Sequence, residues 1–249
     1  MTRINKTKTT KTNKMSNKIR IIKDKIDGTY QIQFAKNVKI LIQSLFNAKL
    51  LQAHTSTITD NYQTLLIKAK TITNFDDFLM NQYETNTQQQ FENKKYEIAL
   101  KIIEDLMKQL KSLFHYKHTF YAFSLEHLFV IDNQQFIYLN LEHLLPLDLN
   151  PKQNPTITLK IPFQREKHGV FLSPEIQEMN ELPFSLDYKT IYYSLGSLII
   201  YFLFETQINE IQENNTKIKE ILKPIKETKL YWFLVRIMNQ QPEERWLYF

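Results

Sequence analysis

The stretch that most constrains this chain is IYYSLGSLIIYFLF, Ile191 to Phe204, fourteen residues without a charged side chain. As a helix rising about 1.5 Å per residue it is about 21 Å long, too short for a bilayer core of about 30 Å. A helix that is apolar on every face is buried in a domain, with other helices around it. The sequence therefore predicts a helical core around this segment and no membrane span.

Hydrophobic periodicity predicts strands and further helices in the rest of the chain. Two strand-like runs in Ile19 to Phe34 flank Asp27-Gly28, a dipeptide that favours a tight hairpin. Asn74 can cap a short helix, and a polar, glutamine-rich connection follows that helix. The other expected elements are a helix over Val38 to Leu51, a strand over Tyr62 to Ile72, an amphipathic helix over Lys94 to Phe114, strands LFVID and QFIYLN on either side of Asn133 and Gln134, and a helical remainder after a proline-punctuated segment. This order is typical of an α+β protein.

The net charge of +6 comes from the first 18 residues, which contain six basic residues and no acidic one. This segment is rich in Thr, Asn and Lys and nearly free of apolar residues, so burial cannot offset the entropy lost on ordering. We expect a disordered basic tail over residues 1–18. It is either a flexible solubilising arm or an arm that contacts polyanions such as nucleic acid.

The chain contains no cysteine, which excludes disulfides and thiolate metal sites and fits a reducing, intracellular compartment, the cytoplasm or a host-cell cytoplasm. The histidines do not follow a zinc-ligand spacing with a helical Glu beside them. A cluster of Glu126, His127, Glu142 and His143 across the hairpin is the one arrangement that could ligate a metal. We take solvated or hydrogen-bonded histidines as the default and expect no metal site.

Three motifs in the C-terminal half resemble those of protein kinases. Ser173-Pro174-Glu175 resembles the Ala-Pro-Glu that ends the activation segment, and YSLG, at Tyr193 to Gly196, resembles the start of the buried central helix. Pro242 to Arg245 resembles a late Pro-x-x-Arg, whose Arg pairs with the Ala-Pro-Glu glutamate in the family. Ser-Pro-Glu and Pro-Glu-Glu are also ordinary helix starts, so their order and spacing carry the resemblance.

The resemblance covers residues 19–249 and implies a two-lobed α+β fold, with a small, mainly β N-lobe and a larger helical C-lobe. We expect the N-lobe and hinge in residues 19–80 and the C-lobe in residues 81–249. Glu175 and Arg245 should meet in the large lobe, beneath the buried helix. Kinase-like genes occur in large DNA viruses, and this Lys-, Asn- and Ile-rich sequence resembles that kind of source.

The resemblance also indicates that the catalytic chemistry is lost. Active kinases carry His-Arg-Asp, then an Asn, then Asp-Phe-Gly; the first Asp accepts the proton of the substrate hydroxyl, and the other two residues hold Mg²⁺. The matching positions here are Ala122, His127 and Asn140. Alanine cannot accept a proton, a neutral imidazole is a poor ligand for Mg²⁺, and Asn140 offers one uncharged amide oxygen.

The nucleotide-binding half of the site is equally reduced. A phosphate-binding loop needs glycines, and Gly28 stands alone where such a loop would begin. Lys36, in QFAK, resembles the phosphate-binding lysine, but no acidic residue occurs between Asp27 and Asp60 to pair with it. Lys36 is therefore either a weak nucleotide contact or a solvated side chain, and we expect no bound ATP or Mg²⁺.

The sequence thus predicts a degenerate kinase-like domain, a pseudokinase, that binds a protein partner or acts as a scaffold. Three alternatives stay open. The chain is an active but atypical ATP-dependent serine/threonine protein kinase, a nucleic-acid-associated protein acting through its basic tail, or a helical interaction module with no kinase ancestry.

Overall fold

The computed structural model describes residues 19–24, 28–59, 61–150, 154–160, 169–208 and 215–248. The basic tail expected over residues 1–18 lies outside the described residues, as does Asp27 of the expected hairpin turn. Gly28, the other residue of that turn, has a positive φ of 70°, a conformation that glycine adopts without strain.

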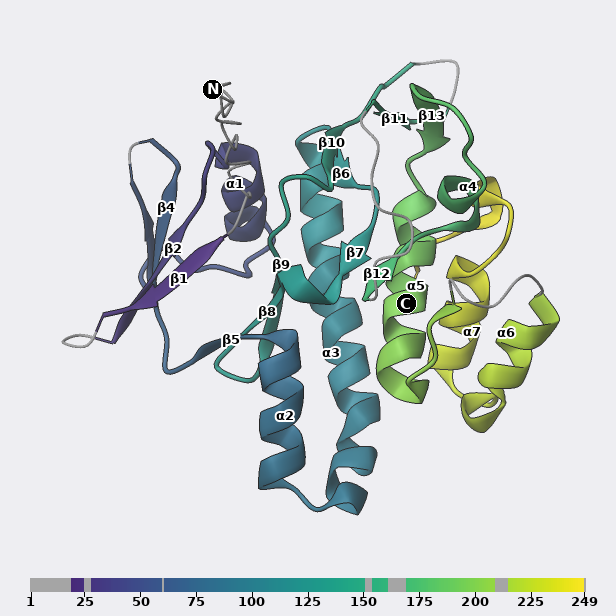
Figure 1. Cartoon of the computed structure of the whole chain (residues 1–249), viewed down its shortest axis with the longest axis horizontal. Coiled ribbons are helices and arrows are strands. Elements are labelled where there is room, and N and C mark those ends of the chain that lie inside the picture. The colour runs from purple at the N-terminus through teal and green to yellow at the C-terminus, as the bar shows by residue number, and fades with distance from the viewer. Residues whose placement is uncertain are drawn as a thin grey trace, which may run out of the picture.

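The N-terminal part is a four-stranded antiparallel sheet with one helix beside it (Figure 1). Alternate residues of the two central strands, among them Ile32 and Leu65, are buried and pack in one core with Leu41 and Leu45 of the helix. The predicted β hairpin is present as the first two strands. The elements, in sheet order, are β1 (Arg20–Lys23), β2 (Thr29–Gln33), β4 (Thr64–Lys68) and β3 (Ser56–Ile58), with helix α1 (Lys39–Asn47) between β2 and β3 in the chain.

The single strand predicted over Tyr62 to Ile72 is instead divided between two sheets. Its first part is β4, and its end starts β5 (Ile72–Asn74), which pairs with β8 (Leu128–Ile131) and through it with β9 (Gln135–Tyr138). Asp132 Oδ1 accepts hydrogen bonds from the backbone N–H groups of Lys70 and Thr71 at 2.7 and 2.9 Å. This contact from a residue 61 positions away fixes the chain between the two strands, so local alternation could not reveal the break.

Two helices form the start of the helical part. The Asn74 cap is confirmed, because its Oδ1 accepts a hydrogen bond from the N–H of Asp77 at 2.7 Å at the start of α2 (Phe75–Thr85). The residue-80 boundary expected between the lobes falls inside α2. The long helix α3 (Gln88–His115) begins six residues before the predicted Lys94, because Thr87 and Gln90 form a reciprocal capping box. The predicted connection thus shortens to Asn86 and Thr87, because α2 continues to Thr85 and the glutamines form the first turn of α3.

The apolar segment at Ile191 to Phe204 forms the buried helix α5 (Thr190–Phe204), as predicted. It contacts α3 on one side and α7 (Lys229–Ile237) on another, and α6 (Asn215–Ile221) lies next to α7 (Figure 1). One continuous apolar core extends from the N-terminal sheet through α3 to α5 and α7. Among the described residues, no helix combines the length and apolar character needed to cross a bilayer.

The prediction that the chain after the proline-punctuated segment is helical is wrong in part, because strands occur there at Val170–Phe171 and Phe184–Asp187, and further short strands that were not predicted lie earlier in the chain. Their pairings join segments far apart in the chain, and two to four residues carry too little local pattern to be recognised. The small sheets pair β6 (His118–Phe120) with β10 (Leu144–Pro146), β7 (Phe123–Ser124) with β12 (Val170–Phe171), and β11 (Thr156–Leu159) with β13 (Phe184–Asp187). Single-turn helices α4 (Pro174–Gln177), η1 (Leu125–His127), η3 (Lys223–Ile225) and η4 (Pro242–Glu244) complete the fold.

Candidate functional site

Two strand ends and η1 bring Ala122, His127 and Asn140 together. The side chain of Ala122 is fully buried, and its carbonyl oxygen lies 2.9 Å from His143 Nδ1. The adjoining backbone is held by α5, because Ser194 Oγ accepts the N–H of Phe123 at 2.7 Å and donates to the carbonyl of Phe171 at 2.6 Å. Hydrogen bonds with Ser194 of the central helix α5 therefore hold the backbone next to Ala122 in place.

Five side chains around this loop form a polar cluster: Ser124, His127, Tyr138, Asn140 and His143. Tyr138 is fully buried, and its hydroxyl lies 2.7 Å from His143 Nδ1 and 3.1 Å from Ser124 Oγ. Ser124 Oγ in turn lies 3.1 Å from His127 Nδ1. The cluster members bond to one another, and a hydrogen-bonded network of this kind holds its side chains in one arrangement.

Asn140 uses both ends of its amide inside this cluster. Its Oδ1 accepts the backbone N–H groups of Glu142 and His143 at 2.8 and 3.2 Å, and its Nδ2 lies 3.2 Å from His127 Nδ1. An amide nitrogen only donates, so His127 Nδ1 accepts and its neutral ring carries the proton on Nε2. The oxygen of Asn140, which the resemblance puts at a magnesium-ligand position, is already engaged by the backbone.

The cluster, whose members include His127 and His143, contains no carboxylate, the group that accepts the proton of the substrate hydroxyl in active kinases. Burial raises the pKa of Tyr138 well above its ordinary range, so its hydroxyl stays protonated. Burial, with the charge of Glu142 as a smaller cause, raises the pKa of the neighbouring Tyr121 to about 12. In the described part of the chain, no group of three or more His, Asp or Glu side chains is arranged to hold a metal ion. Glu126, His127, Glu142 and His143 are therefore not arranged as such a group.

Lys36 lies apart from these residues in a bend between β2 and α1, and its side chain is exposed. Across the described ranges, no hydrogen bond or ion pair engages its Nζ. Helix α1, which follows it, contains no acidic residue in its sequence KILIQSLFN. The structure thus supplies no partner that would orient Lys36.

Glu175 and Arg245 form a two-pronged ion pair in the helical part. Arg245 Nη1 and Nη2 donate to Glu175 Oε1 and Oε2 at 2.6 and 2.9 Å, and Thr190 Oγ1 donates to the same carboxylate at 2.7 Å. The Arg245 side chain is 0% exposed and the Glu175 side chain 17%. Burial alone would raise the pKa of Glu175, but the hydrogen bonds and charge of Arg245 outweigh it and lower that pKa below its ordinary value.

The sequence and the fold were both compared with those of known proteins. No protein-family model and no curated protein sequence matches the chain. Among solved structures, it is similar to ROP2 from Toxoplasma gondii, described as a virulence factor with a protein-kinase fold and no enzymatic activity. That match has 13% identity and a TM-score of 0.50, and covers 91% of this chain and 71% of ROP2. A rhoptry kinase from the same organism matches at 13% identity and a TM-score of 0.50, with 92% of this chain and 70% of the kinase covered.

This chain has a protein-kinase fold. Within the kinase fold, the ion pair expected from the resemblance is present, and Arg245 lies beneath α5, with its guanidinium carbon 5.1 Å from the centre of the Tyr193 ring. Two further carbonyl groups, of Asn239 and Gln240, accept from the same guanidinium. The pair therefore ties α4, α5 and the C-terminal segment together.

The other residues named for structural roles in this kinase fold lie near that pair. Ser173 precedes α4 without capping it through its side chain, and its buried Oγ has no hydrogen-bond partner among the described residues. Pro174 occupies the first turn, where its missing N–H costs nothing. Gly196 allows α5 to approach the end of α7, because a Cβ there would lie 2.4 Å from Met238 Sδ.

Sequence reasoning missed the polar residues that position β9 beside the cluster. Asp105 Oδ2 accepts the N–H of Phe136 at 3.0 Å, and Gln109 exchanges two hydrogen bonds with the backbone of Tyr138 at 2.8 and 3.0 Å. Burial raises the pKa of Asp105, although Phe136 and Lys101 act in the opposite direction. A polar residue on the buried stripe of an amphipathic helix was the one available sign of such a role.

Proposed function

We propose that this chain is a catalytically degenerate kinase-like domain that acts by binding a protein. The observation that carries the proposal is the polar cluster. At the positions that match catalytic Asp, Asn and Asp in active kinases, Ala122, His127 and Asn140 are joined to Tyr138 and His143 by hydrogen bonds within the protein. These bonds use the polar groups that catalysis would have to direct at a substrate.

The chemistry of phosphoryl transfer supports this proposal. The enzyme must position the phosphates and neutralise their charge, which active kinases do with two Mg²⁺ ions held by an Asp and an Asn. Electrostatic stabilisation of this kind is commonly the largest contribution to the rate. Here an alanine stands where the proton acceptor is needed and Lys36 has no acidic partner on α1. ROP2 is described as having a protein-kinase fold and no enzymatic activity, which supports a non-catalytic role for such a fold.

Phosphoryl transfer by the purified chain tests the proposal directly. With ATP and Mg²⁺ we expect no transfer to the protein itself or to generic substrates, and no thermal shift with the nucleotide. The double substitution Ala122→Asp and Asn140→Asp should not restore activity, because the glycine-poor N-lobe still cannot hold the phosphates. Mg²⁺-dependent phosphorylation by the wild type that Lys36→Ala abolishes would instead establish the atypical kinase and reject the proposal.

The finer features of this role stay predictions from the sequence. They are a scaffold or partner-binding function inside a cell, a source of the large-DNA-virus type, and contact with polyanions through residues 1–18. The last of these is the basis of the nucleic-acid alternative, and binding assays with and without the tail separate it from the folded domain.

A further inference from the structure

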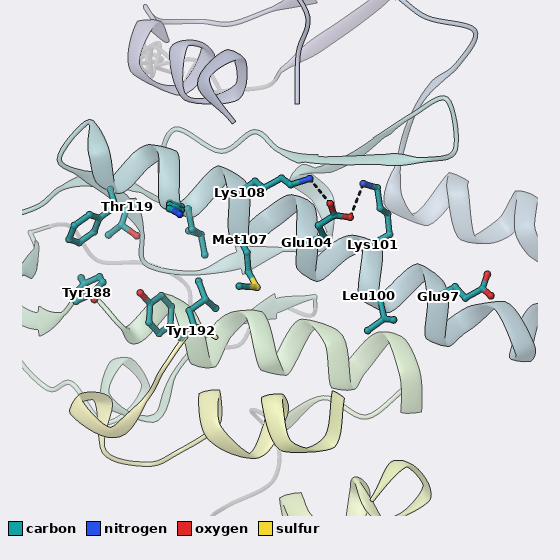
Figure 2. A pocket seen from close by; sticks show the side chains of 13 residues that line it. Glu97, Leu100, Lys101, Glu104, Met107, Lys108, Thr119, Tyr188 and Tyr192 are labelled. Atoms are coloured by element: carbon teal, nitrogen blue, oxygen red, sulfur yellow. Dashed lines mark hydrogen bonds and ion pairs between the residues drawn. The ribbon is translucent and has the colours of Figure 1, made fainter. Parts of the chain in front are cut away.

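A cavity of about 840 Å³ lies along α3, on the side that faces the start of α5 and the C-terminal segment (Figure 2). Leu100 and Met107 point from α3 toward α5, and Tyr188 and Tyr192 form a wall at one end. The residues that line it are Glu97, Leu100, Lys101, Glu104, Met107, Lys108, Leu110, Lys111, Phe114, Thr119, Tyr188, Tyr192 and Leu247. We call this hollow the α3 groove.

Three of the apolar residues that α3 contributes to the α3 groove repeat every seven positions. Leu100, Met107 and Phe114 are seven residues apart and follow one stripe of α3, since seven residues are close to two helical turns. Leu100 and Met107 are half-buried, while Phe114 is 39% exposed and its ring lies 5.2 Å from that of Tyr188. Phe114 lies fourteen positions after Leu100, so the stripe is about 21 Å long at about 1.5 Å per residue, which matches the side of a docked helix rather than a compact ligand.

Charged residues border this stripe in the same seven-residue repeat. Lys108 forms an ion pair with Glu104, and Lys101 pairs with both Glu104 and Asp105, so the middle of the border is neutralised within α3. The side chains of Glu97 and Lys111, at opposite ends of the stripe, are exposed and form no ion pair or hydrogen bond with any part of the chain that the structure describes. The groove therefore offers an apolar floor with a negative charge at one end and a positive charge at the other.

The geometry points to the α3 groove as a docking site for an amphipathic helix of a partner protein, running antiparallel to α3. Such a helix would place large aliphatic side chains, three and four residues apart, over Leu100, Met107 and Phe114. Its first turn would lie near Lys111 and its last turn near Glu97. Acidic residues in the first turn and basic residues in the last turn both stabilise a helix by themselves and complement these two groove charges. The inference rests on the proposed protein-binding role and names the surface and the partner chemistry for it.

A designed peptide of about 18 residues, about 27 Å as a helix, is the probe. It carries Leu at the two apolar heptad positions, Glu in the first turn, Lys in the last turn and a fluorophore for anisotropy titration with the full chain. A second peptide has the Glu and Lys exchanged. The wild type should prefer the first peptide by about threefold to tenfold, as two exposed charge pairs allow, and the double reversal Glu97→Lys with Lys111→Glu should invert the preference.

Two methionines supply a matched pair of variants for the apolar floor. Met107→Glu puts a charge in the α3 groove and should weaken binding of the first peptide by about tenfold or more. Met80→Glu makes the same change on α2, where Met80 is 61% exposed and does not line the groove, and should leave binding unchanged. Phe114→Ala, at the exposed end of the stripe, tests the floor again if Met107→Glu lowers the melting temperature.

Several outcomes would overturn the inference. One is equal binding of the peptide by the Met107→Glu and Met80→Glu proteins, and another is no binding of either peptide. A third is a dimer of the chain that Met107→Glu dissociates, which would make a second copy the occupant, and a fourth is tight binding of decanoate in place of peptide. Phosphoryl transfer measured on the same preparations keeps the two proposals separate. Phosphoryl transfer would refute the degenerate-kinase role whether or not the peptide binds. A protein that neither transfers phosphate nor binds the peptide would refute only the docking site.

Discussion

Replacing Arg245 by alanine should destabilise the fold strongly, because it leaves a buried carboxylate without its partner. The side chain of Arg245 is 0% exposed and that of Glu175 17%, and two N–H···O hydrogen bonds of 2.6 and 2.9 Å join them. Breaking a buried pair by removing one partner costs about 3–5 kcal/mol. The variant also loses the bonds from Arg245 to the carbonyls of Asn239 and Gln240. For a domain of this size, about 2–4 °C per kcal/mol gives a fall in Tm of about 6–20 °C.

The pH dependence supplies a signature that lost packing alone would not give. In the wild type the pKa of Glu175 is lowered below its ordinary 4.5, so the stability it contributes is present above that value and is lost as pH falls through the folded-state pKa. In Arg245→Ala, the burial of Glu175, its largest influence, is opposed only by the hydrogen bonds from Thr190 and the backbone, so we expect its pKa to rise and the variant to be most destabilised when Glu175 must stay ionised. The stability difference between the two proteins should therefore shrink as pH falls below about 5.

Urea unfolding at pH 7 and at pH 4 measures both effects, with Glu175→Gln together with Arg245→Met as the control. That pair removes the buried charge and keeps much of the volume, so it should recover part of the lost stability. A loss under about 1 kcal/mol for Arg245→Ala, the level of an exposed surface pair, would refute the reasoning.

Three further perturbations test other parts of the fold. Ser194→Ala leaves a buried N–H and a buried carbonyl of two adjacent strands without their shared hydroxyl and should cost about 1–3 kcal/mol in urea unfolding, whereas an unchanged midpoint would mean that α5 does not hold the loop. Gly196→Ala places a Cβ against Met238 and should lower Tm through overpacking worth about 1–3 kcal/mol. The double variant Gly196→Ala with Met238→Ala should lose less stability than the sum of the two single losses, because each change relieves the other. Strictly additive losses would contradict the contact. Deleting residues 1–18 should leave Tm unchanged while heparin binding weakens and loses its salt dependence, and undiminished binding at matched salt would assign polyanion contact to the folded domain.

Local pattern was sufficient for the elements with strong periodicity. The buried α5, the N-terminal hairpin and the Asn74 cap were predicted because each depends on a few neighbouring residues, which the sequence displays directly. The start of α3 was wrong by six residues, since a polar glutamine run looks like a connection until its capping box is recognised. The short strands after residue 150 were not predicted, because each is specified by a distant partner strand rather than by its own residues.

For the candidate site, the identities of the residues were readable and their interactions were not. Alanine at 122 cannot accept a proton in any fold, so the sequence, with the kinase resemblance, predicts the loss of that chemistry. That Asn140 turns its oxygen to the backbone, and that His143 and Tyr138 complete a closed polar cluster, depends on side-chain directions set by β9 and η1. No pattern along the chain encodes those directions.

What the sequence by itself determined was the set of apolar segments and the excess of positive charge in residues 1–18, and with the kinase resemblance it predicted that Ala122, His127 and Asn140 replace the residues of phosphoryl transfer. Burial and helix period act between residues a few positions apart, and these can be read along a chain. Only the tertiary structure decided that Glu175 bonds to a residue 70 positions away, that Ser194 joins two strands, and that the stripe of Leu100 and Met107 is left facing a groove. Each of these depends on how separate elements pack in three dimensions, since a hydrogen bond or a cavity is made by both of its sides at once.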